Sequence, residues 1–177
     1  MEAVSRGHEV IFITGESPYI PEGALVEKVV SAGEMMEKVK KHFNKADIII
    51  GAAAVGDFTV EKKAGKIKRI PGGGMSLNLT PTEDIIGWAG NRKGKKKVIG
   101  FAAESGDLKH EAVRKLKSKK LDMIVFNDVS KKDSGFSSDN NEITVISGSG
   151  RILYSGSGPK KNLAAVIINL IENGAKK

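Results

Sequence analysis

Four short apolar segments, rich in isoleucine and valine, set the strongest limit on the fold. They are EVIFITG (9–15), ADIIIGAAAV (46–55), KKVIGFAA (96–103) and LDMIVFN (121–127). Their apolarity is continuous rather than alternating, as strands covered on both faces require. The pattern predicts a mainly parallel sheet buried between two layers of helices.

Helix signals lie between these segments. Ser31 and Glu34 form a capping box, and Thr80, Pro81 and Glu83 form a second helix start with proline at the first helical position. Further helices are predicted over 108–119 and 160–173. The alternating order predicts an α/β protein with a three-layer α/β/α, Rossmann-like fold. A length of 177 residues suits a single domain spanning 1–177.

Two segments are predicted to form hairpins outside this core. Residues 143–156 alternate in hydrophobicity around a Gly/Ser turn, which predicts a late hairpin at one edge of the sheet. Residues 66–79 predict two strands around a Pro-Gly turn, and their first strand carries the basic motif KIKR. This second hairpin is expected to protrude as a lid or as a contact with a partner subunit.

The first residues, MEAVSRG, are typical of the last turns of a helix capped by Gly7, with no strand before it. In doubly wound folds the opening strand and its glycine-rich turn normally carry the phosphates of the ligand. We therefore expect an N-terminally truncated domain that begins inside a βα unit.

Composition excludes several classes of site. The chain has no cysteine, which removes disulfides, cysteine nucleophiles and thiolate metal sites, and its three histidines lack ligand spacing, so no metal site is predicted. No apolar run approaches the ~20 residues that cross a bilayer, and no signal peptide is visible. We expect a cytoplasmic protein with no membrane partner.

The net charge of +8 attracts anions. Nucleic acid is one candidate partner, but aromatic stacking residues are few and the lysines are dispersed along the chain. A solvated surface together with a small phosphorylated ligand explains the charge equally well.

The apolar segment 46–55 ends close to a single carboxylate, Asp57. The carboxyl ends of parallel strands are where open α/β sheets bind ligands, and small neighbours such as Ala53 and Ala54 would let a ligand approach the backbone. A tightly packed strand end with a turn aspartate fits the same pattern as well.

Several cations are further candidates. Lys66 and Lys68 alternate along one strand, and Lys115 and Lys119 share one helix face, where two like charges are unfavourable unless an anion lies between them. Solvated lysines are the commoner explanation in both places. Phe101 lies at another strand end, where it would either stack on a base or belong to the core.

The order of these motifs is more specific than any one of them. AAAVGDF, KIKR, TPTEDII, VIGFAAES, an AxxKLxxKxLDxIVxND run and GFSSDNNEITVI follow one another along the chain. Together they resemble phosphopantothenoylcysteine synthetase, an enzyme family of coenzyme A biosynthesis, from about residue 5 to about residue 170.

The resemblance implies a ligase that uses CTP, with Mg²⁺, to activate the carboxylate of 4′-phosphopantothenate as an acyl-cytidylate with release of pyrophosphate. Cysteine then displaces CMP to give 4′-phosphopantothenoylcysteine. It also implies a homodimer whose basic strand crosses the subunit interface, and no nucleic-acid partner.

The resemblance assigns roles by motif. Lys66 would contact the triphosphate and act in catalysis, and Asn127 would lie on the substrate side. The residues implied in CTP binding are Ala53, Ala54, Asp57, Lys66, Pro81, Thr82, Glu83, Asp84, Phe101, Lys115 and Lys119.

Three departures from the family pattern accompany the resemblance. TPTEDII is longer than the usual NPDI, GDF replaces ADY or ADW, and the asparagine that supports the acyl-cytidylate matches no residue here. A nucleotide-binding fragment without turnover is therefore one alternative. A dinucleotide-dependent reductase, which would need a glycine fingerprint that is absent, and a basic nucleic-acid-binding module are the others.

Overall fold

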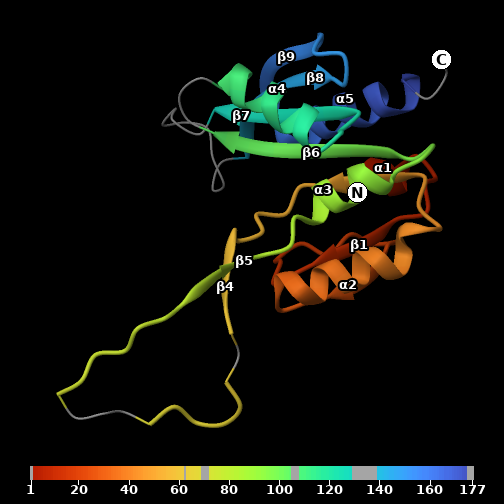
Figure 1. Cartoon of the computed structure of the whole chain (residues 1–177). Coiled ribbons are helices and arrows are strands. Elements are labelled where there is room, and N and C mark those ends of the chain that lie inside the picture. The colour runs from red at the N-terminus through yellow and green to blue at the C-terminus, as the bar shows by residue number, and fades with distance from the viewer. Residues whose placement is uncertain (1, 62, 69–71, 105–107, 129–138, 175–177) are drawn as a thin grey trace.

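The computed structural model describes residues 2–61, 63–68, 72–104, 108–128 and 139–174 (Figure 1). Five of their strands form one sheet in the order β3-β6-β7-β8-β9. These strands are β3 (Ile48–Gly51), β6 (Lys97–Glu104), β7 (Met123–Asp128), β8 (Asn140–Ser147) and β9 (Ile152–Pro159). The first three are parallel, whereas β8 and β9 are antiparallel additions at one edge. The predicted α/β class with a mainly parallel central sheet is confirmed.

The first apolar segment pairs elsewhere. β1 (Ile11–Thr14) forms a separate two-stranded parallel sheet with β2 (Leu25–Lys28). The second of these strands was not predicted, because LVEK is short and half charged. Figure 1 shows helix α2 (Ala32–Phe43) lying along this small sheet.

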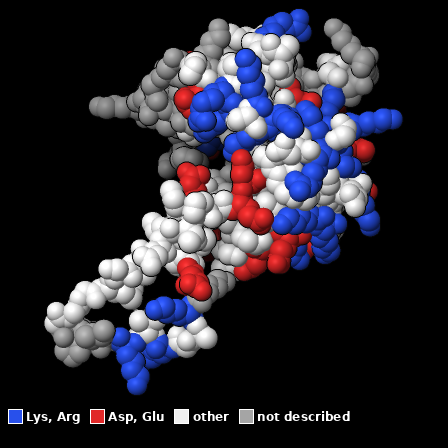
Figure 2. All heavy atoms as spheres, in the orientation of Figure 1, with Lys and Arg blue, Asp and Glu red and all other residues white. Residues whose placement is uncertain are grey.

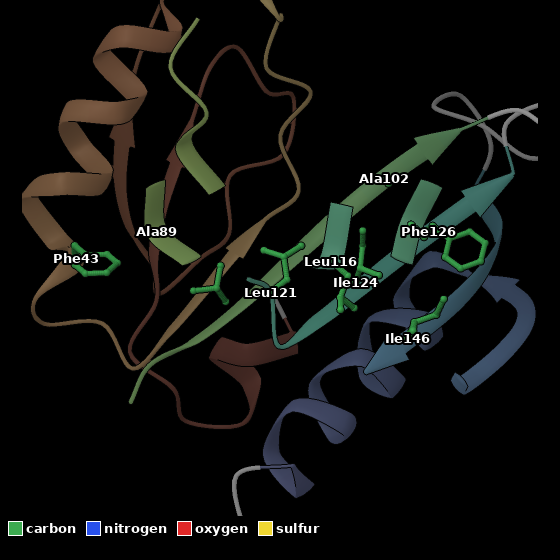
Figure 3. Close-up of a cluster of buried hydrophobic side chains, with 10 residues drawn as sticks. Phe43, Ala89, Ala102, Leu116, Leu121, Ile124, Phe126 and Ile146 are labelled. Atoms are coloured by element: carbon green, nitrogen blue, oxygen red, sulfur yellow. The ribbon is translucent and has the colours of Figure 1, made fainter. Parts of the chain in front are cut away.

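Helices cover both faces of the five-stranded sheet. Helices α3 (Ile85–Arg92) and α4 (Leu108–Ser118) contribute Ala89, Ala112 and Leu116 to one buried cluster (Figure 3). Helix α5 (Lys160–Asn173) buries Leu163, Ile167 and Ile171 against the opposite face. The short helix α1 (Glu2–Ser5) lies beside α5. The predicted three-layer arrangement therefore holds for the central sheet.

Strand β6 shows how the two clusters divide. Val98 and Ala102 belong to the cluster under α3 and α4, whereas Ile99 belongs to the cluster under α5. Successive side chains of a strand point to opposite faces, so a continuous apolar run is needed to fill both. The sequence pattern of 96–103 follows directly from this double burial.

The two predicted helix starts had different outcomes. Ser31 caps α2 and accepts a hydrogen bond from the Glu34 N–H, which confirms the first; the Glu34 carboxylate accepts from the N–H of Val30. The second prediction was wrong. Thr80 and Pro81 lie in β5 (Leu79–Pro81), and α3 begins four residues later, behind Asp84.

Strand pairing explains this correction. β5 pairs antiparallel with β4 (Phe58–Val60), which holds Thr80 opposite Thr59 and Pro81 opposite Phe58. An extended backbone at these positions is incompatible with a helix start, and Asp84 provides an equally good cap. The tertiary contact overrides the local signal.

Of the two predicted hairpins the late one is confirmed, whereas the prediction of two strands within 66–79 was wrong: Lys66 and Lys68 lie outside any strand, because the backbone pairs only between β4 and β5. The late hairpin is β8–β9 and is longer than 143–156. The other is paired only at its base, through β4 and β5, and the described residues beyond the pair contain no strand. We call the described residues 58–61, 63–68 and 72–81 the arm; in Figure 1 they project away from the rest of the molecule.

Gly7 has the left-handed backbone conformation expected of a helix cap, with φ of 85°. Within the described residues, no helix combines the length and apolarity needed to span a membrane.

Glu27 joins the edge strand β2 to α2. Its carboxylate accepts hydrogen bonds from Lys38, from Lys41 at 2.7 Å and from His42 at 2.9 Å, and only 15% of its side chain is exposed. These donors, Lys38 first, hold the pKa of Glu27 far below its ordinary value of 4.5. The carboxylate is therefore more favourable in the folded protein than in the unfolded chain.

Replacing Glu27 by glutamine should destabilise the protein in a pH-dependent way. Because the folded-state pKa is lowered, the stabilisation is present above pH 4.5 and is lost as the pH falls towards the folded-state pKa. Denaturant unfolding of wild type and Glu27→Gln should differ most near pH 7 and converge in acid. A difference that grew on acidification would contradict this assignment.

Candidate functional site

The segment after β3 is tied to the segment before α3. The N–H of Thr82 donates to the carbonyl of Asp57 at 2.9 Å, and its hydroxyl donates to the carbonyl of Gly56 at 2.6 Å. Hydrogen bonds of this kind contribute about 1 kcal/mol each. They hold the predicted residues Asp57 and Thr82 together at the carboxyl end of β3, where the sequence placed the site.

Helix α3 is packed against the end of β3 through a glycine. A Cβ on Gly51 would lie 2.2 Å from the side chain of Ile86, in the first turn of α3. The absence of a side chain at Gly51 therefore lets α3 pack closely against the end of β3. The contact places the first turn of α3 beside residues 52–57.

Asp84 caps α3 and also binds the end of α4. One carboxylate oxygen, Oδ1, accepts from the N–H of Gly87 at 3.0 Å and from the ammonium of Lys119 at 3.0 Å. Two predicted nucleotide-binding residues, separated by 35 positions, thus meet directly. We define the candidate site as residues 52–57, 82–84 and Lys119.

Lys119 can reach Asp84 because two segments of backbone touch. A Cβ on Gly90, in α3, would lie only 1.9 Å from the carbonyl oxygen of Lys119. Only glycine permits this approach, so Gly90 determines how closely the end of α4 lies against α3. Sequence reasoning missed both Gly90 and the Asp84–Lys119 ion pair, since neither has a local sequence signal.

Two other predicted residues, Phe101 and Asn127, lie outside the candidate site. Phe101 and Asn127 have the strand parity of Ile99 and Val125, which pack under α5, so they lie on the face of the sheet opposite α4. Phe101 is 40% exposed, as a ligand contact would require. Glu83 is directed to α2, where it pairs with Lys40 at 3.5 Å.

The course of the backbone places four further predicted residues: Lys115, Ala53, Ala54 and Pro81. Lys115 lies on α4 one turn before Lys119. The N–H of Lys119 donates to the carbonyl of Lys115 at 3.0 Å. Ala53, Ala54 and Pro81 are exposed. Ala53 and Ala54 belong to the candidate site, whereas Pro81 and Lys115 lie next to it along the chain.

The arm, which includes residues 63–68, projects away from the candidate site (Figure 1). Lys63, Lys66 and Lys68 are all exposed there. Figure 2 shows basic side chains along the outer part of the arm and acidic side chains on the body where the arm leaves it. Within one chain, the basic motif and the Asp57–Asp84 region are separate.

The described residues contain no group of three or more acidic or histidine side chains suited to hold a metal ion. The carboxylates of Asp57 and Asp84 are nevertheless exposed at the site. Mg²⁺ is commonly bound by one or two carboxylates together with substrate phosphates. The donor set fits an ion that arrives with a nucleotide better than a resident metal centre.

Comparison with protein families shows to which family the chain belongs. The model of the DNA/pantothenate metabolism flavoprotein C-terminal domain matches residues 1–175. The chain belongs to this family. The resemblance to phosphopantothenoylcysteine synthetase inferred from the motif order is thereby confirmed at the level of the family domain.

Curated relatives agree with this assignment. The chain is 39% identical over 146 residues to the coenzyme A biosynthesis bifunctional protein CoaBC of Bacillus subtilis, covering 81% of this chain and 36% of that protein. It is 38% identical over 172 residues to a cysteine/cysteine sulfinic acid decarboxylase of an unknown prokaryotic organism, covering 96% of this chain and 48% of that protein. The chain therefore spans less than half of each of these relatives.

Solved structures show the same fold. The C-terminal domain of a CoaBC protein superposes with a TM-score of 0.77 at 32% identity, covering 98% of this chain and 80% of that domain. A Cab2 mutant in complex with phosphopantothenate-cysteine superposes with a TM-score of 0.63 at 15% identity, covering 88% of this chain and 54% of the other. The second likeness concerns the fold alone.

Replacing Gly90 by alanine should destabilise the protein by about 1–3 kcal/mol, because the new Cβ forces α3 away from the Lys119 carbonyl. Chemical denaturation measures the change. Gly33→Ala in α2 is the matched control: its Cβ would meet only the Ser31 hydroxyl at 4.0 Å, so the better helix propensity of alanine should leave stability equal or higher. Equal effects at both positions would contradict the packing role of Gly90.

Proposed function

We propose that this chain is the ligase domain that joins 4′-phosphopantothenate to cysteine at the expense of CTP. The observation that carries the proposal is the meeting of three predicted motifs: Asp57 with Thr82, and Asp84 with Lys119, at the carboxyl end of β3. Family membership and the CoaBC relatives support a role in coenzyme A biosynthesis.

The proposed chemistry needs binding and charge neutralisation more than a protein nucleophile. A carboxylate oxygen of phosphopantothenate attacks the α-phosphorus of CTP, and the bond to the β-phosphate breaks to release pyrophosphate. The cysteine amine then attacks the acyl carbon, the bond to CMP breaks, and the amine loses a proton. Cations held near the phosphates stabilise the charge that develops on pyrophosphate.

The residues of this chain divide that work in a consistent way. Lys119 provides a cation fixed on the body beside the start of α3. Lys66 would provide a second from the arm, and Asp57 would contact the ribose or base. Mg²⁺, when bound with the nucleotide, would add charge neutralisation at the phosphates. Phe101 and Asn127 lie on the α5 side of the sheet. Phe101 would stack on the nucleotide base, and Asn127 would contact the acyl substrate.

Titration calorimetry with CTP and Mg²⁺ tests the proposal, with ATP and CMP as comparison ligands. Preferential CTP binding is expected. Lys66→Ala should weaken CTP binding about tenfold, because a charge-assisted phosphate contact is lost, and should change CMP binding little.

The two ligands separate the outcomes. Equal weakening of CTP and CMP would remove Lys66 from the phosphate role, and failure of the wild-type chain to bind any nucleotide would reject a nucleotide site in this chain. Binding to any polynucleotide with strong salt dependence, and without preference among free nucleotides, would instead support the nucleic-acid alternative.

We further propose that a second copy of the chain supplies the arm. In the β4–β5 ribbon, Phe58, Val60 and Leu79 share one face, opposite Thr59 and Thr80, and 61%, 41% and 59% of these three apolar residues is exposed. An exposed apolar face of this kind is typical of a surface that binds a partner. The basic arm and the acidic body beside the site are complementary in charge (Figure 2).

Sedimentation equilibrium should therefore give twice the chain mass of 18.9 kDa for the wild type. Leu79→Asp should shift the protein to monomer, because it places a charge on the apolar face. Thr59→Asp, on the opposite face of the same ribbon, is the matched control and should remain dimeric. A monomeric wild type, or equal dissociation of both variants, would overturn this assembly.

A further inference from the structure

We propose that Asp84 is a positioning residue: its carboxylate holds the ammonium of Lys119 at the candidate site before ligand arrives. The proposal rests on the proposed function, in that Lys119 is taken to contact the nucleotide's phosphates. It assigns Asp84 a task distinct from contacting CTP directly, which is the role that the family resemblance implied.

The geometry at Asp84 is specific to this task. The Oδ1 atom accepts from both the Gly87 N–H and the Lys119 ammonium, each at 3.0 Å. The hydrogen bond from the Gly87 N–H fixes the rotamer of Asp84. The Lys119 ammonium therefore meets an acceptor that is already held in place. The side chains of Lys119 and Asp84 are 32% and 51% exposed, which leaves the ammonium accessible to an incoming anion.

Lys119 is held at both ends. Its carbonyl lies against Gly90, and its ammonium reaches the cap of the same helix, six residues earlier. Six helical residues span about 9 Å along the axis. The lysine therefore lies extended along α3, and its amine is delivered to the helix start beside Thr82.

Gly87 completes the arrangement. A Cβ at this position would lie 2.4 Å from Asp84 Oδ2 and 2.8 Å from its Cγ. The carboxylate thus occupies space that any other residue would fill. Gly87→Ala offers a way to displace the carboxylate while every charge of the site is retained.

Capping alone would explain part of this geometry, so the two roles must be separated. Asparagine caps helices as well as aspartate does, but it presents no negative charge to a lysine. Asp84→Asn therefore keeps the cap and removes the negative charge that holds Lys119, whereas Asp84→Ala loses both. A released lysine must lose its rotamer freedom when it binds an anion, and this lowers affinity.

A double-mutant cycle tests the proposal, with Asp84→Asn, Lys119→Met and the double variant titrated with CTP and Mg²⁺. We expect Asp84→Asn to weaken CTP binding about three- to tenfold and to have no further effect in the Lys119→Met background. The melting temperature of Asp84→Asn should match that of wild type, whereas the melting temperature of Asp84→Ala should be lower. Gly87→Ala should weaken CTP binding in the same direction as Asp84→Asn.

Asp47→Asn is the matched control for the loss of one negative charge. Asp47 immediately precedes β3, at the end of that strand opposite the site, and this variant should bind CTP as wild type does. Unchanged or tighter binding by Asp84→Asn would overturn the proposal, because the carboxylate would then act only as a cap or as a competing charge. An equal loss of affinity in the Lys119→Met background would also overturn it.

A ligand-free measurement keeps this inference distinct from the proposed function. Acetylation of Lys119, followed by mass spectrometry, should be faster in Asp84→Asn than in wild type, with Lys93, paired to Asp122 at 2.7 Å, as the internal reference. If wild type binds no CTP, the proposed function fails, and the labelling rates still decide whether Asp84 restrains Lys119. Equal rates in the two proteins would refute the restraint itself.

Discussion

The close packing of α3 between β3 and the end of α4 is the constraint on which the candidate site depends. Two glycines make it possible: Gly51 leaves room for Ile86, and Gly90 lets the Lys119 carbonyl approach the helix backbone. Because both contacts involve the body of α3, they fix its position along and across the sheet edge. Asp57, Thr82, Asp84 and Lys119 meet as a consequence.

The site also shows how one carboxylate can serve structure and charge placement together. Asp84 satisfies a backbone donor of α3 and neutralises Lys119 through the same oxygen. An exposed ion pair contributes little to stability by itself. The Asp84–Lys119 ion pair instead holds the lysine at the start of α3, where its ammonium is accessible to an anionic ligand.

The arm places charge differently. Its basic residues lie away from the candidate site of their own chain, and its apolar ribbon face is exposed (Figures 1 and 2). An exposed apolar ribbon with a basic outer part has the properties of an interaction element more than those of a folded core. The separation of Lys66 from Asp57 within one chain therefore supports the proposed assembly of two copies.

The sequence by itself determined the parallel sheet, the burial of β6 on both faces, the Ser31 cap, the late hairpin and the family, because these depend on hydrophobic periodicity, local hydrogen bonds and motif order. Tertiary structure alone decided that α3 begins at Asp84, since pairing of Thr80 and Pro81 with β4 overrides a local capping signal. It also decided that Asp84 meets Lys119, because a contact across 35 residues depends on how closely two helices pack. That distance is set by Gly90, whose effect on packing has no local sequence pattern.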